Sequence, residues 1–427
     1  MGDIDKATGV TNAVSIQLEP GPRSLSAAAT PMLGLGDAVQ RTLKNDPRLQ
    51  MALASVQRAL ADADQARLLP NPVLNVLVRF PEGGGSANVE AGLSADLLSI
   101  LQIPGRTSAA DNRFRAVSAA AVQAAIDVVA EVQESYADAQ ASDALLPLLE
   151  VRRALLLRLL EFARTKLAAG EGIRTDVTTL DAQRVALEIE IARVRQDRLE
   201  QRLHLARLVG ETEGDAQWSL DPWSPPLLEE PIERDWILTA LEHRPELRVV
   251  EWQLAALGDD FSLVRWAALG TASAGVNAER DGPLRLGPTA AVSIPIFDFG
   301  QARRERIRAE VLESRHELTL IGRTVVEEVR RAVSAYRYSQ ATLARVRNEL
   351  IPLQTERRAL AEQAFRLGQN DVTSTFLAEQ DLRAAEAQRI ELERQVAVSI
   401  VRLQRAVGGP GVAATLVRGA GNVEEKK

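Results

Sequence analysis

Residues able to do chemistry are few in this chain, and none of them are spaced like an active site. There is no cysteine, which excludes disulfides, thiolate metal sites and cysteine nucleophiles. Gly34-Leu35-Gly36 lacks both the third glycine and the preceding strand of a nucleotide-binding loop. The three histidines lie on predicted helices with no second ligand at metal-binding spacing, so we expect surface residues: His204, His243 and His316. We therefore predict no catalytic residue, no metal site and no cofactor.

The composition favours long helices. Hydrophobic residues make up 46% of the chain and charged residues 26%, which predicts a folded protein. Aromatic residues are only 4%, whereas compact cores use large rings to bury area. Alanine, leucine, glutamate and arginine dominate instead, as in coiled coils. The net charge of −7 argues against a protein that binds nucleic acid, which would show a basic surface.

The two ends of the chain are predicted to be loose. Residues 1–30 are polar and lack the basic start and apolar core of a signal peptide, so we expect a flexible leader over residues 1–33. The Gly-rich end predicts a loose tail over residues 410–427. No run of 18 or more apolar residues exists, so no membrane-spanning helix is expected.

Between these ends the chain is duplicated. Three pairs of matching landmarks are each 198 residues apart: Pro47 and Pro245, Gly170 and Gly368, Gly210 and Gly408. One spacing shared by three landmarks indicates two related repeats, which we place at residues 34–217 and 232–409. A proline-rich linker, residues 218–231, joins them.

Each repeat contains two segments in which apolar and polar residues alternate, at about 74–80 and 88–96 and again at about 271–279 and 289–296. Strict alternation predicts strands with one apolar and one polar face. A half-buried sheet in a soluble protein would show the same pattern. Strands of about nine residues can also cross a bilayer when tilted, but four strands cannot close a membrane barrel, which needs at least about eight. A barrel would therefore need several chains, and the residues do not choose between two and three.

Helices surround these strands. A first helix is predicted at 35–69 and 233–269, and a long one at 107–168 and 301–367, with Pro147 and Pro352 expected to kink or interrupt the long helices. A return helix then follows a Gly-containing turn in each repeat. In the first return helix two adjacent apolar stripes are seen, one with Leu187 and Ile191 and one with Val185 and Ile189. Two stripes suit a helix packed between two neighbours, as in a ring of helices, although an ordinary bundle also fits.

Two segments carry a resemblance to a known family. Residues 290–311 (AAVSIPIFDFGQARRERIRAEV) resemble the strand-to-helix junction of TolC-family outer-membrane factors, and residues 350–388 resemble their helix–turn–helix. Within the second segment, Pro352, Phe365 and Gly368 match the family's proline and its aromatic–x–x–Gly turn. The resemblance covers residues 35–408, and it is specific because it combines these segments with the duplication.

The resemblance implies a mainly α fold with antiparallel β structure and two internal repeats. It implies a long coiled-coil helical barrel, plus a β-barrel with four strands from each protomer that is completed by trimerisation. Such a homotrimer would lie in outer-membrane lipid with its helical part in the periplasm. It would be the channel of a tripartite efflux or type I secretion system, passively conducting substrates from a periplasmic adaptor and an inner-membrane pump to the outside. The alternative is a periplasmic or soluble coiled-coil scaffold without channel activity.

The resemblance also suggests residues for each part of a channel. Polar residues of the strands are candidates for the barrel lumen: Asn75, Arg79, Glu90, Asp96, Asn277 and Glu279. Acidic residues after the turns are candidates for a periplasmic gate: Asp176, Asp181, Asp371 and Glu379. The turns themselves are candidates for adaptor-binding tips: Gly170, Gly172, Arg366, Leu367 and Gly368. Simple helix capping is the alternative for Asp176, Asp371 and the second turn.

Overall fold

The computed structural model describes residues 2–11, 14–15, 32–80, 82–84, 87–211, 218–224, 228, 230–267, 270–280, 283–294, 296–367, 369 and 372–416. The chain forms two compact units. Met1–Gln50, Ala124–Arg244 and Val325–Lys427 form the first, which we name the helical unit. Met51–Gln123 and Pro245–Thr324 form the second, which we name the sheet unit.

The first helix of each repeat is broken at the residue before its proline. In repeat 1, α2 (Leu35–Asn45) ends at Asp46 and α3 (Pro47–Arg67) begins at the next residue. In repeat 2, α7 (Glu233–His243) and α8 (Pro245–Ala267) are separated by Arg244 in the same way. Asp46 and Arg244 are both extended, with ψ of 119° and 122°. A proline ring clashes with the preceding residue in the helical conformation, so a single helix over 35–69 or 233–269 is not formed.

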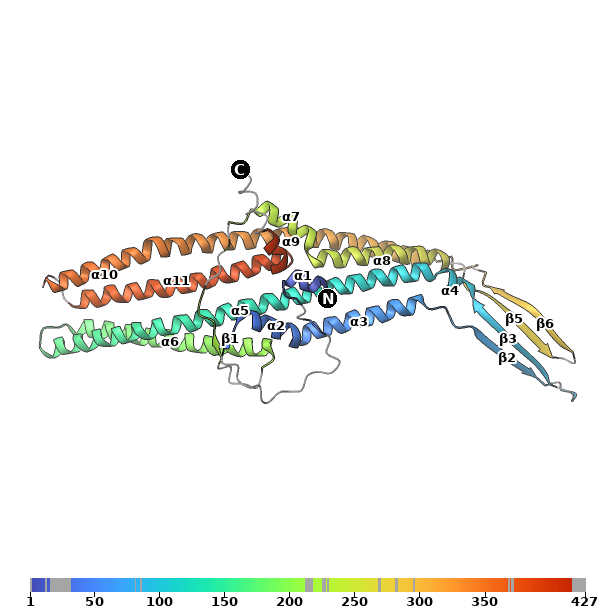
Figure 1. The fold of residues 1–427 in the computed structure, drawn as a ribbon, viewed down its shortest axis with the longest axis horizontal. Coiled ribbons are helices and arrows are strands. Elements are labelled where there is room, and N and C mark those ends of the chain that lie inside the picture. Colours follow the sequence, from blue (N-terminus) through green and yellow to red (C-terminus); the bar gives the residue numbers. More distant parts are fainter. Residues whose placement is uncertain are drawn as a thin grey trace. The chain divides into compact units, whose positions relative to one another are not determined.

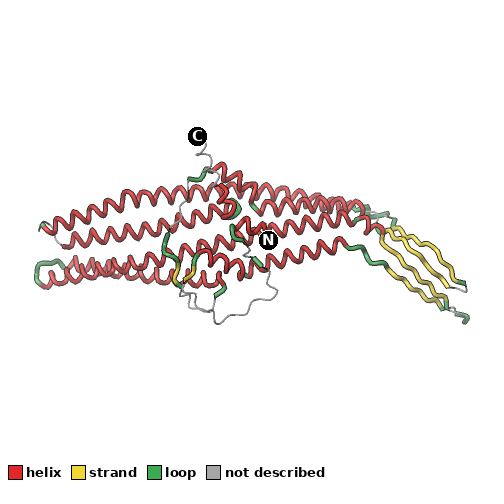
Figure 2. Tube along the Cα trace, in the orientation of Figure 1, coloured by secondary structure: helices red, strands yellow, loops and turns green. Residues whose placement is uncertain are grey.

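The sheet unit contains one four-stranded antiparallel sheet in the order β2-β3-β5-β6. Its strands are drawn in yellow in Figure 2. The strands are β2 (Val73–Arg79), β3 (Asn88–Asp96), β5 (Ala272–Arg280) and β6 (Leu284–Val292). Each repeat supplies one hairpin, and the two hairpins join between β3 and β5, where Glu90 lies opposite Glu279. Strands β2 and β6 are the two edges, and each has one unpaired side within the described chain.

The last strand lies earlier than the sequence predicted. Strand β6 begins at Leu284, between the two segments of predicted alternation at 271–279 and 289–296, and it ends at Val292 rather than near residue 296. Pro288 lies within the strand, opposite Val276. A proline cannot donate a ladder hydrogen bond, but β6 is an edge strand, where that loss is tolerated.

The long helices pair into two hairpins in the helical unit (Figure 1). The chain runs from the sheet unit through α4 (Leu97–Leu101) and α5 (Ile103–Ala168), then returns as α6 (Arg174–Val209). In repeat 2 it runs through α9 (Gln301–Arg345), the π-helical turn η1 (Val346–Leu350) and α10 (Ile351–Arg366), and returns as α11 (Val372–Ala406). Pro352 therefore follows a break in regular α-helix, as expected, but Pro147 lies inside α5 without an interruption.

Large apolar side chains fill the core of each hairpin. Leu149, Leu156 and Leu159 of α5 are buried against Leu187 and Ile191 of α6, which are the first of the two predicted stripes. In repeat 2 the corresponding core is formed by Tyr336, Leu343, Val346, Leu392, Val396 and Ile400. Packing on both sides of Pro147 holds α5 to α6, which accounts for the helix continuing through a residue that removes one backbone hydrogen bond.

The first residues of the chain correct part of the prediction of a flexible leader over residues 1–33; residues 1, 12–13 and 16–31 lie outside the described residues. Residues Gly2–Thr8 form helix α1, and its Ile4 and Ala7 are buried. Helix α1 packs against the segment after α11. The two backbones approach so closely that a side chain on Gly409 would collide with the Ala7 backbone, and one on Gly411 with the Lys6 backbone. Residues 410–416 are helical, so the predicted tail is ordered at least that far.

Two short strands complete the helical unit. Strand β1 (Met32–Leu33) pairs in parallel with β4 (Ser219–Leu220), which belongs to the linker between the repeats.

Among the described residues, α5 is the one helix that meets length and composition criteria for crossing a membrane, contrary to our expectation of none. Because 44% of its apolar window is buried and core helices of soluble proteins meet the same criteria, we assign it no membrane role.

Candidate functional site

The sheet has one polar and one apolar face. Strand pairing places Glu90 opposite Glu279 and Gly92 opposite Asn277, so each polar residue has its cross-strand partner on the same face. All six residues predicted for a lumen share this face: Asn75, Arg79, Glu90, Asp96, Asn277 and Glu279. The register adds Asn88, Arg285 and Thr289. Arg285 was missed because it lies between the two segments of predicted alternation, 271–279 and 289–296.

Polar contacts link neighbouring strands across this face. The Asn277 side-chain amide donates to Glu90 Oε1 at 2.7 Å, and the Asn88 amide donates to Glu279 Oε1 at 3.1 Å. Arg79 lies 3.5 Å from the Glu90 carboxylate. These groups surround the directly opposed carboxylates Glu90 and Glu279, and a cleft of 310 Å³ on this face is lined partly by Asn75, Glu90 and Asn277. The face is therefore mainly polar, and the larger apolar side chains that the register places on it are Val73 and Leu77 of the edge strand β2.

The opposite face exposes apolar side chains. Leu74 and Val76 of β2 are 66% and 60% exposed, and Leu286 of β6 is 70% exposed. Leu93, Val276, Leu284 and Val292 belong to the same face and are each more than half exposed. A contiguous exposed apolar surface of this kind marks an interface with lipid or protein.

Asp96 has a local role on the polar face. Its Oδ1 accepts hydrogen bonds from the backbone N–H groups of Leu98 at 3.0 Å and Ser99 at 3.1 Å, and its other oxygen accepts from the Ser99 hydroxyl. The carboxylate thus caps α4, and its lone pairs are engaged by backbone donors that would otherwise lack partners.

Glycines shape the turn between α5 and α6. Gly170 has a φ of +79°, and the Glu171 N–H donates back to the Lys166 carbonyl at 3.0 Å. A side chain on Gly172 would lie 2.8 Å from the Leu167 backbone nitrogen. The turn is therefore tight, and the predicted tip residues Gly170 and Gly172 are explained by backbone geometry. The turn geometry does not test the suggested contact of Gly170 and Gly172 with an adaptor, which stays a prediction.

Asp176 is exposed in the first turn of α6. The N-cap of this helix is Ile173, without a side-chain hydrogen bond, so the capping interpretation of Asp176 is wrong. A carboxylate in the first turn is nevertheless favoured by the positive end of the helix dipole.

Asp181 and Glu379 occupy equivalent positions in the two repeats, and both are ion-paired with two arginines. Asp181 accepts from Arg184 at 2.9 Å and from Arg164 of α5 at 2.9 Å. The hydrogen bond from Arg184, aided by Arg164, holds the pKa of Asp181 below its usual range. Glu379 lies 2.8 Å from Arg383 and 3.5 Å from Arg358. Both charges are therefore largely compensated within the hairpins.

The second turn is described only in part. Arg366 is bound to Glu362 at 2.5 Å, and Leu367 caps α10 with 63% of its side chain exposed. Gly368 and Asp371 lie outside the described residues, so their predicted roles as tip and gate are neither supported nor contradicted.

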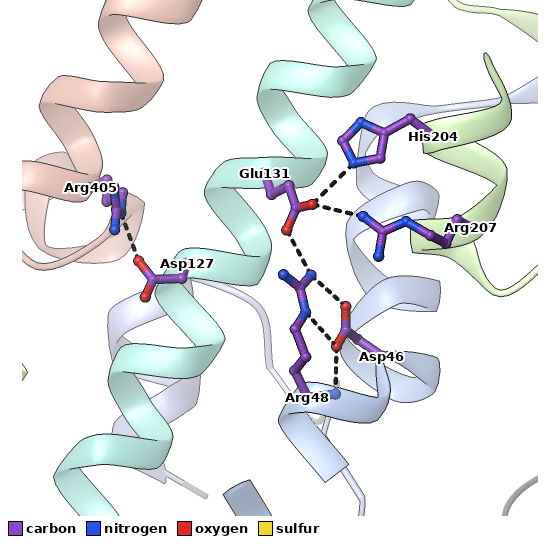
Figure 3. A network of polar contacts seen from close by, with 7 residues as sticks. All are labelled: Asp46, Arg48, Asp127, Glu131, His204, Arg207 and Arg405. Carbon is purple, nitrogen blue, oxygen red and sulfur yellow. Dashed lines mark hydrogen bonds and ion pairs between the residues drawn. The ribbon is translucent and has the colours of Figure 1, made fainter. Parts of the chain in front are cut away.

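A polar network in the helical unit joins the start of α3 to α5 and α6 (Figure 3). The Arg48 guanidinium lies between the carboxylates of Asp46 at 2.8 Å and Glu131 at 2.7 Å. Glu131 also lies 3.0 Å from Arg207 and 3.0 Å from His204 Nε2. The sequence predicted His204 to be an ordinary surface residue, and its half-exposed ring instead joins this network.

A second set of ion pairs joins α5 of repeat 1 to α11 of repeat 2. Arg405 binds Asp127 at 2.6 Å, as Figure 3 also shows, and Arg394 binds Asp138 at 2.7 Å. Between them Arg402 binds Glu134 at 3.2 Å. The sequence analysis did not predict these ion pairs. The pattern that could have indicated them is a set of acidic residues at helical spacing on α5 and a set of arginines at helical spacing on α11. Both networks are structural, and the described residues contain no group of three side chains able to hold a metal ion.

Comparison with known proteins identifies the architecture. The model of the outer membrane efflux protein family matches residues 38–211 and again residues 236–409, two segments offset by the same 198 residues as the sequence landmarks. No curated protein sequence matches significantly.

Solved structures share the fold. The CmeC outer membrane channel of Campylobacter jejuni is similar with a TM-score of 0.74 and 15% identity, over 88% of this chain and 85% of that one. The outer membrane protein VceC of Vibrio cholerae gives 0.73 and 16%, over 88% and 96%. CusC gives 0.72 and 18%, over 92% and 98%.

The predicted resemblance and the two-repeat fold are thus confirmed, and the scaffold alternative finds no support. The chain belongs to the outer membrane efflux protein family, and its function is efflux through an outer-membrane channel rather than catalysis.

Proposed function

We propose that three copies of this chain form the channel, with the polar face of each sheet lining the lumen and the apolar face in contact with outer-membrane lipid. The observation that carries this proposal is the division of the sheet into a polar and an exposed apolar face, with an unpaired edge on either side. Unpaired backbone groups cannot face lipid, so β2 of one copy must pair with β6 of the next. Three copies supply twelve strands, enough to close a barrel.

The helical unit offers a second surface for assembly. The second stripe of α6 is exposed in the single chain: Ile189 is 65% exposed, and Leu199 and Leu203 are each 51% exposed. Val185 extends it at 45%. A helix with a buried stripe and an adjacent exposed apolar stripe suits a position between two neighbours in a closed ring. A neighbouring copy is therefore the occupant we assign to this stripe.

The partners and the gate belong to the same proposal. We place the helical hairpins in the periplasm, with the turns at Gly170, Gly172, Arg366, Leu367 and Gly368 meeting an adaptor that links the channel to an inner-membrane pump. Of the candidate gate residues, Asp176 is the best placed to act on ions, because Asp181 and Glu379 already bind two arginines each. A ring of exposed carboxylates near an axis attracts cations.

Two neighbouring residues of β5 test the assignment of faces. Val276→Arg places a charge on the apolar face and is expected to destabilise the inserted barrel by about 2–4 kcal/mol per copy, so that few channels insert into a planar bilayer. Asn277→Arg places the same charge on the polar face. It is expected to permit insertion while shifting ion selectivity toward anions, because the arginines would line the lumen.

Conductance steps and reversal potentials of the two purified variants provide the measurement. If Val276→Arg inserted normally and Asn277→Arg did not, the faces would be assigned the wrong way round. If neither variant nor the unaltered protein conducted while its fold was intact and its turns were open, the proposed channel would be refuted.

A further inference from the structure

A cleft of 530 Å³ lies in the helical unit between α9 and α11, the outgoing and the returning helix of the second hairpin. Short side chains create the hollow, because Ala332, Ala335 and Ser339 share one face of α9 at helical spacing. Helix α11 contributes Val398 and Ser399, and the two buried serine hydroxyls lie 3.3 Å apart in the floor. Clefts of roughly 300–1,000 Å³ hold small organic ligands.

Arginines give this cleft a positive lining. Among the described residues, its charged groups are one glutamate, Glu328, and five arginines: Arg244, Arg331, Arg394, Arg402 and Arg405. The buried Arg244 contacts Glu328 at 2.7 Å, which compensates that carboxylate. The acidic partners of Arg402 and Arg405 belong to α5 and are not among the residues that line the cleft. A concave surface lined by one sign of charge concentrates its field, so this cleft favours an anion.

Two arginines at the rim keep donors for a ligand. The side chains of Arg331 and Arg402 are 78% and 64% exposed. Arg331 contacts Glu327 of its own helix through one nitrogen at 2.6 Å, and Arg402 contacts Glu134 through two nitrogens at 3.2 and 3.3 Å. A guanidinium has five N–H donors, so neither group is saturated. Guanidinium groups with spare donors bind carboxylates well, often through two parallel hydrogen bonds.

The hairpin fold does not require this lining. In α6, the residues that correspond to Arg394, Val398 and Arg402 of α11 are Gln196, Glu200 and His204. The return helix of repeat 1 therefore packs in its own hairpin with a carboxylate where α11 has an apolar floor, and without the two arginines. The combination of an apolar floor and a positive rim calls for an explanation other than folding.

We propose that this cleft binds an amphiphilic organic anion, a molecule with a carboxylate head and a flat apolar body. The carboxylate accepts hydrogen bonds from Arg331 and Arg402, and the apolar body lies over Ala335 and Val398 beside the Tyr338 ring, which is 70% exposed. The inference goes beyond the proposed channel and does not depend on it, because all the residues that line the cleft belong to the helical unit of one copy.

Equilibrium binding of naphthoate, an aromatic carboxylate, tests the chemistry of the ligand. The full chain is purified in a neutral maltoside detergent, and binding to protein-free micelles is subtracted. Naphthoate is expected to bind at least about tenfold more tightly than naphthamide, its uncharged analogue, because only the carboxylate gains charge-assisted hydrogen bonds. Equal affinity for the two compounds, or no binding of naphthoate, would overturn the inference.

A double variant tests the two rim arginines. Arg331→Gln/Arg402→Gln is expected to weaken naphthoate binding by at least about tenfold. The matched control is Arg330→Gln/Arg193→Gln, which removes two arginines that are 64% and 82% exposed and do not line the cleft. This control is expected to bind naphthoate as the unaltered protein does. Equal weakening in both double variants would assign the effect to overall charge and overturn the site.

A cavity-filling pair tests the floor without changing any charge. Ala335→Trp fills the cleft from an exposed position of α9, whereas Ser334→Trp places the same ring on a neighbouring exposed position outside the cleft. The first variant is expected to abolish naphthoate binding and the second to retain it, with circular dichroism confirming equal helix content in all variants. Binding that survives Ala335→Trp would overturn the site. Conductance is not the readout, so such a failure would leave the proposed channel standing.

Discussion

At the scale of single residues, the position before the proline shows how one backbone requirement accepts opposite side chains. Asp46 and Arg244 are equivalent in the two repeats, and both adopt the extended conformation that a following proline imposes. Asp46 accepts from Arg48, whereas the buried Arg244 donates to Glu328 at 2.7 Å and to the Ala406 carbonyl at 3.3 Å. The proline determines the break in the helix in both repeats. The charged residue before it has a different partner in each repeat, Arg48 for Asp46 and Glu328 for Arg244.

Arg48→Met is expected to destabilise the helical unit by about 1–3 kcal/mol at neutral pH, because it leaves the buried Asp46 carboxylate without its charged partner. Burial raises the pKa of Asp46, but hydrogen bonds from Arg48 outweigh it and hold that pKa below the ordinary value. A lowered pKa contributes stability above the ordinary value of about 3.9, and this contribution disappears as the pH falls through the folded-state pKa. The difference between variant and unaltered protein is therefore expected to shrink on acidification.

Urea unfolding followed by circular dichroism, at neutral pH and again in acid, provides the measurement. Arg58→Gln is the matched control, an exposed arginine on the same helix α3. A loss of stability in Arg48→Met that stayed constant with pH would show that Arg48 acts by packing rather than through Asp46.

At the scale of the elements, α6 carries two apolar stripes, one packed within the hairpin and one that we propose contacts a neighbouring copy. Its first stripe is buried within the hairpin, and its second is exposed. Ile189→Lys/Leu203→Lys is expected to cost about 1.5–3 kcal/mol per side chain at each contact between copies, and so to shift the protein from trimer to monomer. Helix content should remain, because both side chains are exposed in the single chain.

Light scattering coupled to size exclusion, with the detergent contribution subtracted, would report that change in mass. Glu200→Lys is the control, since it adds the same charge to an exposed position outside both stripes. A trimer that persisted in the double variant would assign the exposed stripe to another partner.

The elements also show what sequence could and could not predict. The duplication, the long helices and three of the four strands follow from spacing and alternation, which depend on local backbone geometry. Strand β6 was displaced because Pro288 reads as a loop signal, and only the strand order shows that it lies at an edge. Pro147 was expected to kink or interrupt α5. That α5 continues through it without an interruption depends on the packing of α6 along both sides of the proline, which is tertiary information.

The same limit applies to the candidate site. Alternation placed all six lumen candidates on one face, since period two is a property of any strand. It could not show that Asp96 caps α4, or that Asp181 and Glu379 each meet two arginines, because those partners come from the turn that follows or from a facing helix.

At the scale of the whole molecule, the repeats make any acidic entrance uneven. Asp176 of repeat 1 corresponds to Ser374 of repeat 2, so a trimer would carry three such carboxylates around its axis rather than six. Asp176→Ser is expected to reduce cation selectivity, and Ser374→Asp is expected to increase it, because the ring of charge is removed or doubled.

Reversal potentials in a salt gradient measure that selectivity. Glu171→Gln, which removes a charge from the neighbouring turn, is the control and should have the smaller effect. Selectivity unchanged in both Asp176→Ser and Ser374→Asp would remove the entrance from this part of the helices.

The two open sheet edges have a consequence for gene dosage. In the proposed barrel each copy pairs its β2 and β6 with the two neighbouring copies. One copy whose β2 or β6 cannot pair therefore inactivates the whole trimer, including its two functional copies. In a cell that makes both forms, the share of intact channels would be the cube of the share of sound chains. An edge-strand variant should therefore be dominant over the unaltered gene, whereas a variant that cannot fold at all should be recessive.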